Sequence, residues 1–326
     1  MVVTMNLSRI LLATLAYVCI ALGTVGGAIY YIAHSKNSVD QNTLVYIPPG
    51  SGLLRISWIL KNNNIIRSPW QFRLISTVNG MNSQLRAGEF EIVAGASVSA
   101  ILDTITKGKL YKRRLIIPEG SSNVQIADII KIAPGLEVPD IMPEEGYLLP
   151  ETYFYHYGSK SSDIIEQMAQ GLSEKLDKVW AQRPPNFSLR SKHELLTLAS
   201  IIEKETSLES ERKRVAAVFL NRLHRGMRLQ SDPTVIYGIT GGYKLDRRLT
   251  AADINQATEY NTYRIKGLPP GPIANPGLAS IEAVINAAPV KDLYFVADGT
   301  GGHAFATTLD EHNKNVKKWR RIRDAK

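Results

Sequence analysis

The feature that most constrains this chain is an uninterrupted apolar run near its N-terminus. Residues 10–33 contain no charged side chain, and Arg9 stands immediately before them. As a helix, this run would span roughly 36 Å, enough to cross the hydrocarbon core of a bilayer. A cleaved signal peptide is the alternative, but its apolar region would be shorter and would end in an A-x-A-like site. We therefore expect an uncleaved transmembrane helix over residues 10–33.

The charges that flank this run predict its orientation. Arg9 and the α-amino group precede the run, whereas Lys36 and Asp40 follow it. Under the positive-inside rule, this arrangement favours a cytoplasmic tail over residues 1–9 and the bulk of the chain outside the cytoplasm. We expect a single-pass protein of the inner (cell) membrane, in contact with its lipid, whose main part lies in the periplasm.

The composition excludes several classes of protein. The 39 Lys and Arg residues outnumber the 30 Asp and Glu residues, which gives a formal net charge of +9. Such an excess favours polyanions, but the basic clusters at 107–114 and 317–323 do not alternate with aromatic residues as nucleic-acid-binding segments do. Cys19 lies inside the apolar run, and the six histidines show no metal-binding spacing. We expect no nucleic-acid partner, no metal and no cofactor.

After a short polar stalk over residues 34–42, one local pattern occurs twice. Residues 43–47 and 114–117 are each predicted to form a strand, followed by a Pro- and Gly-containing turn and a helix. The repetition indicates either a small α+β module used twice or a common way to start a helix. The length of 326 residues suggests two packed units in addition to the apolar segment.

A predicted helix that begins after Ser191 carries a candidate catalytic acid. Ser191 and Glu194 have the spacing of a capping box. Leu198, Ile202 and Glu205 then stand at i, i+4 and i+7, so Glu205 occupies a position where the pattern requires an apolar residue. Burial of a carboxyl group raises its pKa and lets it hold a proton near neutral pH. Cleavage of a glycosidic bond requires a general acid of this kind.

The same position also has a purely structural interpretation. Glu205 could pair with an arginine of the following helix, and the candidates are Arg212, Arg214 and Arg222. The helical pattern turns Glu203 away from Ile202 by about 100°, so we expect a charge on the solvent side there, and another at Lys204. Periodicity alone does not separate a catalytic Glu205 from an ion-paired one.

Downstream segments supply polar and aromatic groups that suit sugar hydroxyls. They comprise residues 228–234, with Gln230, Ser231 and Asp232; residues 260–263, with Tyr260, Asn261 and Tyr263; and a proline-rich loop over 267–277. Residues 293–306 are predicted to form a hairpin that contains His303, and a basic helix follows it. All of these segments could equally serve as rigid connections and core.

Taken together, these strings resemble the MltG/YceG-like family of endolytic murein transglycosylases. The matching motifs occur in order along the chain: EGYLLPETY at 145–153, ASIIEKET at 199–206, MRLQSDPTVIYG at 227–238, YNTY at 260–263, GLPPGPI at 267–273 and HAF at 303–305. The resemblance implies an α+β fold with a small LysM-like module, here residues 43–112, followed by a catalytic domain, here residues 113–326.

The activity that this resemblance implies is that of a lyase. It would cleave the MurNAc–GlcNAc β-1,4 bond of nascent glycan strands without water, leaving 1,6-anhydro-MurNAc ends and terminating strand elongation. The family's catalytic glutamate corresponds to Glu205. Implied partners are peptidoglycan glycan strands and penicillin-binding protein synthases. We expect the substrate to contact the following residues: Glu151, Gln230, Ser231, Asp232, Tyr260, Asn261, Tyr263 and His303.

Two other functions stay open at this point. A hydrolytic muramidase would need a second carboxylate across the cleft. Asp232 and Glu151 are the candidates for it. Alternatively, the chain is a non-catalytic, membrane-tethered scaffold that binds peptidoglycan.

Overall fold

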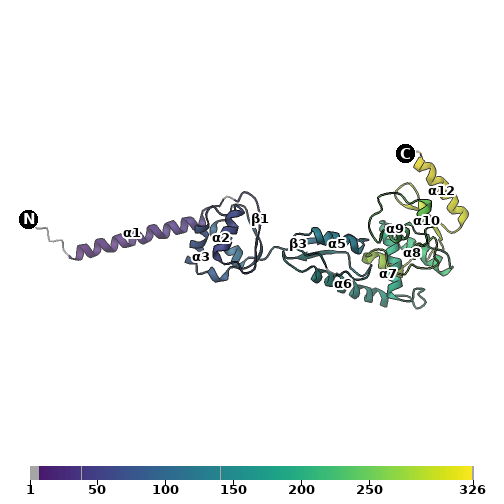
Figure 1. Ribbon diagram of the computed structural model, residues 1–326, viewed down its shortest axis with the longest axis horizontal. Coiled ribbons are helices and arrows are strands. Elements are labelled where there is room, and N and C mark those ends of the chain that lie inside the picture. The colour runs from purple at the N-terminus through teal and green to yellow at the C-terminus, as the bar shows by residue number, and fades with distance from the viewer. Residues whose placement is uncertain (1–6, 38, 140, 325–326) are drawn as a thin grey trace, which may run out of the picture. The chain divides into compact units, whose positions relative to one another are not determined.

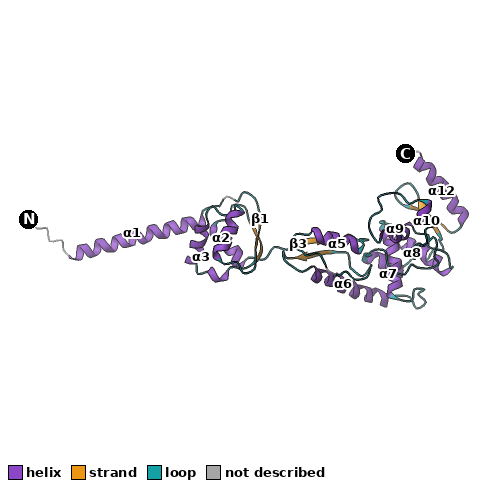
Figure 2. Ribbon diagram, viewed as in Figure 1, coloured by secondary structure: helices purple, strands orange, loops and turns teal. Residues whose placement is uncertain are grey.

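The computed structural model describes residues 7–37, 39–139 and 141–324, and the fold is α+β (Figure 1). The chain divides into two compact units. The first unit comprises the residues up to Arg113 together with 156–158, and the second comprises residues 114–155 and 159–326. The helices and strands of both units are distinguished by colour in Figure 2.

The predicted apolar segment forms one long helix, α1 (Leu7–His34). By length and composition this helix is able to cross a membrane, and none of the residues in its most apolar stretch is buried. A core helix of a soluble protein would be buried instead. The observation fits a membrane anchor or a signal sequence near the N-terminus.

The first unit contains one two-stranded antiparallel sheet with three helices around it. Its elements are β1 (Thr43–Ile47), α2 (Leu53–Asn62), α3 (Pro69–Val78), a short 3₁₀ turn at Asn82–Gln84, β2 (Gly88–Ile92) and α4 (Val98–Lys107). The strands pair from Thr43 opposite Ile92 to Ile47 opposite Gly88. Alternate residues of β1 point into a core that includes Ile47, Phe72 and Phe90, all fully buried.

The second unit is larger and mostly helical. Its elements are β3 (Arg113–Ile116), α5 (Asn123–Ile132), β4 (Thr152–Tyr155), α6 (Ser161–Ala181), α7 (Lys192–Glu205), α8 (Glu209–His224), α9 (Asp232–Thr240), α10 (Ala251–Asn255), α11 (Leu278–Ile285), β5 (Tyr294–Ala297), β6 (His303–Ala306) and α12 (Leu309–Asp324). Strands β3 and β4 form one two-stranded sheet. The predicted hairpin is confirmed as β5 and β6, which pair antiparallel from Tyr294 opposite Ala306.

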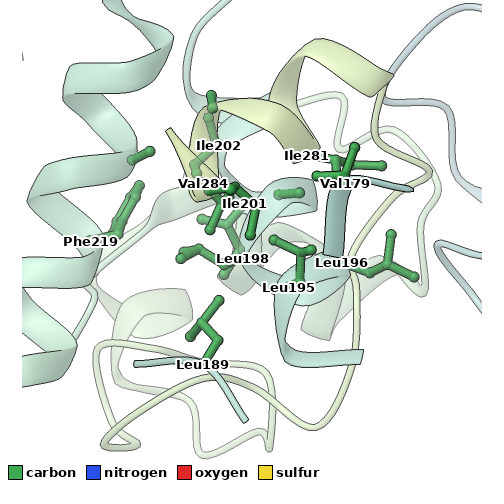
Figure 3. Close-up of a cluster of buried hydrophobic side chains, with 14 of the residues drawn as sticks. Val179, Leu189, Leu195, Leu196, Leu198, Ile201, Ile202, Phe219, Ile281 and Val284 are labelled. Carbon is green, nitrogen blue, oxygen red and sulfur yellow. The ribbon is translucent and has the colours of Figure 1, made fainter. Parts of the chain in front are cut away.

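Helix α7 lies at the centre of the second unit's core. Every residue from Leu195 to Ile202 is buried, including Thr197 and Ser200. Helices α8, α9 and α11 pack against α7, and α6 adds side chains to the same core (Figure 3). A helix that is apolar on all sides is buried on all sides. Each fully buried Leu or Ile contributes about 1.5–3 kcal/mol relative to an exposed position. The prediction of a single buried face was therefore too narrow, because α7 is free of the core only at its ends.

The start of α7 differs in one detail from the predicted capping box. The Ser191 hydroxyl accepts a hydrogen bond from the Glu194 amide at 3.1 Å, as predicted. The reciprocal bond is replaced, because the Glu194 carboxylate accepts from the amide of Arg190 at 2.6 Å rather than from that of Ser191. Ser191 thus satisfies one of the amides that the helix N-terminus leaves free, whereas Glu194 binds the residue before the N-cap.

Candidate active site

Glu205 is the last residue of α7, where this central helix leaves the core. Its side chain is partly buried, and the Ser231 hydroxyl donates a hydrogen bond to Glu205 Oε1 at 2.5 Å. Burial raises the pKa of Glu205 to about 7, the Ser231 bond opposes this rise, and the negative charge of Asp232 adds to it. Glu205 is thus able to carry a proton near neutral pH.

The backbone that leads into α9 positions Ser231 against Glu205. Gln230 adopts a left-handed conformation, with φ +53°, and its amide donates to the carbonyl of Thr262 at 3.2 Å. The Ser231 amide donates to Thr262 Oγ1 at 2.9 Å, and the side chain of Ser231 is almost fully buried. Thr262 therefore holds both residues, and the serine hydroxyl has a fixed direction toward the carboxyl group.

A second carboxylate lies beside this pair. The Tyr263 hydroxyl donates to Asp232 Oδ1 at 2.6 Å, and Asp232 is exposed at the first position of α9. Burial raises the pKa of Tyr263, and the bond to Asp232 and the charge of Glu205 raise it further. Tyr263 therefore stays protonated and holds the Asp232 carboxylate next to Glu205.

The opposite charges near Glu205 come from His303 and Arg222, both of which lower its pKa. The ring of His303 shares a 2.7 Å hydrogen bond between Nδ1 and Glu211 Oε2, and its amide donates to Glu211 Oε1 at 2.9 Å. These two contacts with Glu211 fix the imidazole at the start of β6.

Two of the three arginines considered as ion-pair partners of Glu205 bind other groups, and the third is buried. Arg222 Nε donates to the carbonyl of Leu293, and Arg214 pairs with Asp292 at 2.6 Å. Arg212 is buried on α8. Within the described ranges, no ion pair joins Glu205 to any of the three. The ion-pair interpretation of Glu205 is therefore wrong for the part of the chain that the structure describes.

Three of the predicted contact residues lie outside this cluster. Glu151 forms an ion pair with Lys175. Tyr260 packs against Tyr237, with ring centroids 4.8 Å apart. Asn261 is fully buried, and its amide donates to two backbone carbonyls of its own loop, so it has no exposed atom for a ligand. The cluster around Glu205 thus contains Ser231, Asp232, Tyr263 and His303, with Gln230 acting through its backbone.

The prediction that Glu203 is a solvent-side charge is wrong. Glu203 is only partly exposed, and its Oε2 accepts a hydrogen bond from the Gly277 amide at 3.0 Å. The charge of Glu203 also raises the pKa of Glu119, after the larger effect of burial on that residue. Lys204 is exposed as expected, although its ammonium donates to the carbonyl of Gly120 at 3.1 Å.

Sequence reasoning missed a second buried carboxyl group, Glu145. It accepts hydrogen bonds from the Asn123 amide at 3.0 Å and from Asn275 Nδ2 at 3.1 Å, and burial raises its pKa to about 7. Its position in the EGYLLPETY motif was visible, but its partners lie 22 and 130 residues away. Helical or strand periodicity does not indicate contacts at that separation.

Comparisons with known proteins give one consistent assignment. Residues 45–318 match the model of the YceG-like family. The chain is 32% identical to the endolytic murein transglycosylase of Bacillus subtilis (strain 168), covering 90% of this chain and 91% of that protein. It is 28% identical to the endolytic murein transglycosylase of Streptococcus pneumoniae (strain D39), but it spans only 63% of that longer protein.

A solved structure agrees with these matches. The crystal structure of a yceG-like protein of Listeria monocytogenes superposes with a TM-score of 0.56 at 32% identity, covering 84% of this chain and 98% of that one. Both the sequence and the fold of most of this chain thus match members of one family. The chain belongs to the YceG-like family.

Proposed function

We propose that this protein is an endolytic murein transglycosylase, which cleaves the MurNAc–GlcNAc β-1,4 bond without water and leaves 1,6-anhydro-MurNAc ends. The observation that carries the proposal is the Glu205 carboxyl group, held by Ser231 at the end of α7 with a pKa of about 7. The names of the B. subtilis and S. pneumoniae relatives support it. As in those relatives, the activity would be that of a lyase.

In the proposed reaction, Glu205 acts first as an acid and then as a base. Ser231 donates to Oε1, so the proton of the neutral acid is expected on Oε2, which would donate it to the substrate. Glu205 protonates the glycosidic oxygen as the C1–O bond breaks, and positive charge develops at C1. The resulting carboxylate then takes the proton of the MurNAc C6 hydroxyl, whose oxygen forms the new bond to C1.

The intramolecular nucleophile explains why one carboxyl group suffices. Hydrolytic glycosidases use two carboxylates, either to activate water or to form a covalent intermediate. Here the C6 hydroxyl is already attached to the reacting sugar, and such enforced proximity replaces a separate nucleophile. The negative charge of Asp232, which already acts on the pKa of Glu205, would stabilise the positive charge at C1.

That same carboxylate keeps a hydrolytic muramidase as the second candidate. Asp232 is exposed and adjacent to Ser231, so it is placed to activate a water molecule, whereas Glu151 is engaged by Lys175. Mass spectrometry of sacculi digested with the purified protein distinguishes the candidates. Anhydro ends would support the transglycosylase, reducing ends the hydrolase, and an absence of new ends would leave only a peptidoglycan-binding scaffold.

The substitution Ser231→Ala should shift the pH dependence of cleavage upward. The hydroxyl stabilises the ionised form of Glu205, so its removal should raise the pKa of this group above about 7. The alkaline limb of the pH–rate profile reports loss of the general acid, and it should move to higher pH by roughly 0.5–1 unit, as expected for one lost charge-assisted hydrogen bond. An alkaline limb that moves to lower pH would contradict this role of Ser231.

The remaining features fit this proposal. Helix α1 would anchor the enzyme in the cell membrane as a single span, with the rest of the chain on the periplasmic side. Residues 43–112 would form a LysM-like module and residues 113–326 the catalytic domain. Ser231, Asp232, Tyr263 and His303 would contact the glycan near the cleaved bond. Penicillin-binding protein synthases would supply the nascent strands that the enzyme terminates.

A further inference from the structure

A cavity of about 280 Å³ lies beside the C-terminal end of α7, in the second unit. Lys204, which lines it, directly precedes Glu205, and Pro233, which also lines it, directly follows the Ser231–Asp232 pair. On α9, residues 233, 236, 237 and 240 face this space, as the spacing of one helical face requires. The cavity therefore adjoins the candidate active site on both of the elements that build the site.

Two ammonium groups give the cavity its charge. Lys204 donates one hydrogen bond to the carbonyl of Gly120, which leaves two of its three N–H donors for another acceptor. Lys244 lies 3.8 Å from Asp246, and both side chains are more than four-fifths exposed, so this pair holds the lysine only weakly. None of the described residues that line the cavity is acidic. The cavity is suited to an anion.

The other walls are apolar and fixed in place. Ile236, Tyr237 and Tyr243 line the cavity with hydrophobic surface. The Ser122 hydroxyl donates to the carbonyl of Gly242 at 2.7 Å, which ties the turn after α9 to the start of α5. Gly242 has φ +97°, and a Cβ atom there would lie 2.7 Å from the side chain of Ser122. The wall is therefore preorganised and does not need to form upon binding.

We propose that this cavity binds the short acidic peptide that muramic acid residues of murein carry, with peptide carboxylates facing Lys204 and Lys244. The inference rests on the proposed function, because the position of the cavity beside Glu205 then places it next to the muramic acid at the cleaved bond. A volume of about 280 Å³ lies just below the range of pockets for drug-sized ligands, so it fits a short peptide segment and not a glycan strand. The apolar walls suit the alkyl side chains of such a peptide.

The test compares binding to two forms of one polymer. Fluorescently labelled glycan strands would be used either with their peptides or after complete removal of the peptides by an amidase. Binding is measured by anisotropy with the full chain carrying Glu205→Gln, so that strands are not consumed. We expect tighter binding to the peptide-bearing strands. In the same background, Lys244→Gln should reduce that preference by about two- to fivefold, the loss expected for one exposed ion pair.

The double substitution Lys204→Gln with Lys244→Gln should abolish the preference, and added salt should weaken it in the parent protein. Lys178→Gln is the matched control, because Lys178 is exposed on α6 and does not line the cavity. Equal affinity of the parent for both forms of strand would overturn the proposal. An unchanged preference in the double variant, or an equal loss in Lys178→Gln, would overturn it as well.

The outcome for the proposed function is read separately, from the ends that the wild-type chain produces. Cleavage without any peptide preference refutes the assignment of the cavity and leaves the transglycosylase proposal intact. A peptide preference that depends on Lys244, without any new ends, refutes the catalytic proposal and supports the cavity as a binding site.

Discussion

Replacing Glu205 by glutamine should abolish the release of anhydro ends from purified glycan strands. Glutamine keeps the size of the side chain and still accepts the hydrogen bond from Ser231, but it has no acidic proton to give. General acid–base catalysis contributes about 10²–10⁴-fold in rate, and here one group performs both steps, so the loss should be at least of this size. Mass spectrometry of the digested strands measures it.

The same substitution should not destabilise the folded protein at pH 8. Its effect on the free energy of unfolding depends on pH. Because the folded-state pKa of Glu205, about 7, exceeds the usual value of 4.5, the folded state binds this proton more tightly. The stabilisation from this group is fully present below pH 4.5 and is lost as pH rises through about 7. At pH 8 the ionised carboxylate is therefore unfavourable, and Glu205→Gln should raise the thermal midpoint by about 2–4 °C.

Glu203→Gln is the matched control for both measurements. It makes the same chemical change two residues earlier on α7, and the glutamine oxygen is still able to accept the hydrogen bond from Gly277. Cleavage should stay close to that of the wild type. If both variants lost activity equally, or if Glu205→Gln lowered the thermal midpoint at pH 8, Glu205 would be a structural residue and the catalytic proposal would fail.

The largest loss of stability is expected for Asn275→Ala. Asn275 is fully buried, its Oδ1 accepts from the Leu148 amide at 2.8 Å, and its Nδ2 donates to Ser121, Asn123 and Glu145 at 2.9–3.1 Å. Alanine would leave these buried groups without a partner, at about 1–3 kcal/mol each for those that water does not reach. We expect the free energy of unfolding to fall by about 3–5 kcal/mol, measured by urea denaturation.

An exposed asparagine provides the comparison. Asn286 directly follows the last residue of α11, and its Nδ2 donates to the carbonyl of Glu282 at 3.0 Å at the protein surface. Water replaces that bond, so Asn286→Ala should change the free energy of unfolding by less than about 1 kcal/mol. If the two variants were equally stable, the hydrogen-bond network of Asn275 would not hold the loop 272–277 in place.

The contrast between Asn275 and Glu205 shows what the sequence was able to predict. Local patterns identified the strand at Thr43–Ile47, the C-terminal hairpin and the helix that carries Glu205, because each depends on neighbours along the chain. They also predicted that burial raises the pKa of Glu205, as it does in the structure. The contacts of Asn275 span up to 154 residues, and no periodicity indicates which distant backbone group a buried amide will meet.

The same reason explains why sequence reasoning did not find the partners of Asn261 and Glu203. Asn261 was an attractive sugar ligand by residue type, yet the loop around it uses its amide completely. Helical geometry correctly rotates Glu203 away from the core of α7, but it does not reveal that the loop at Gly277 covers that side. The helical period specifies the side of the helix to which a side chain points. Which group the side chain contacts on that side depends on tertiary packing.

The left-handed backbone at Gln230 also bears on how this protein can evolve. A residue other than glycine in that conformation carries a strain of order 1–3 kcal/mol, which persists only where its surroundings enforce it. Random mutation followed by screening for heat resistance alone would favour substitutions that remove the strained backbone conformation at residue 230. The hydroxyl of Ser231 would then no longer point at the carboxyl group of Glu205. Variants selected only for thermostability should lose activity through changes at this position first. Variants selected for catalytic turnover as well should retain the left-handed conformation of residue 230.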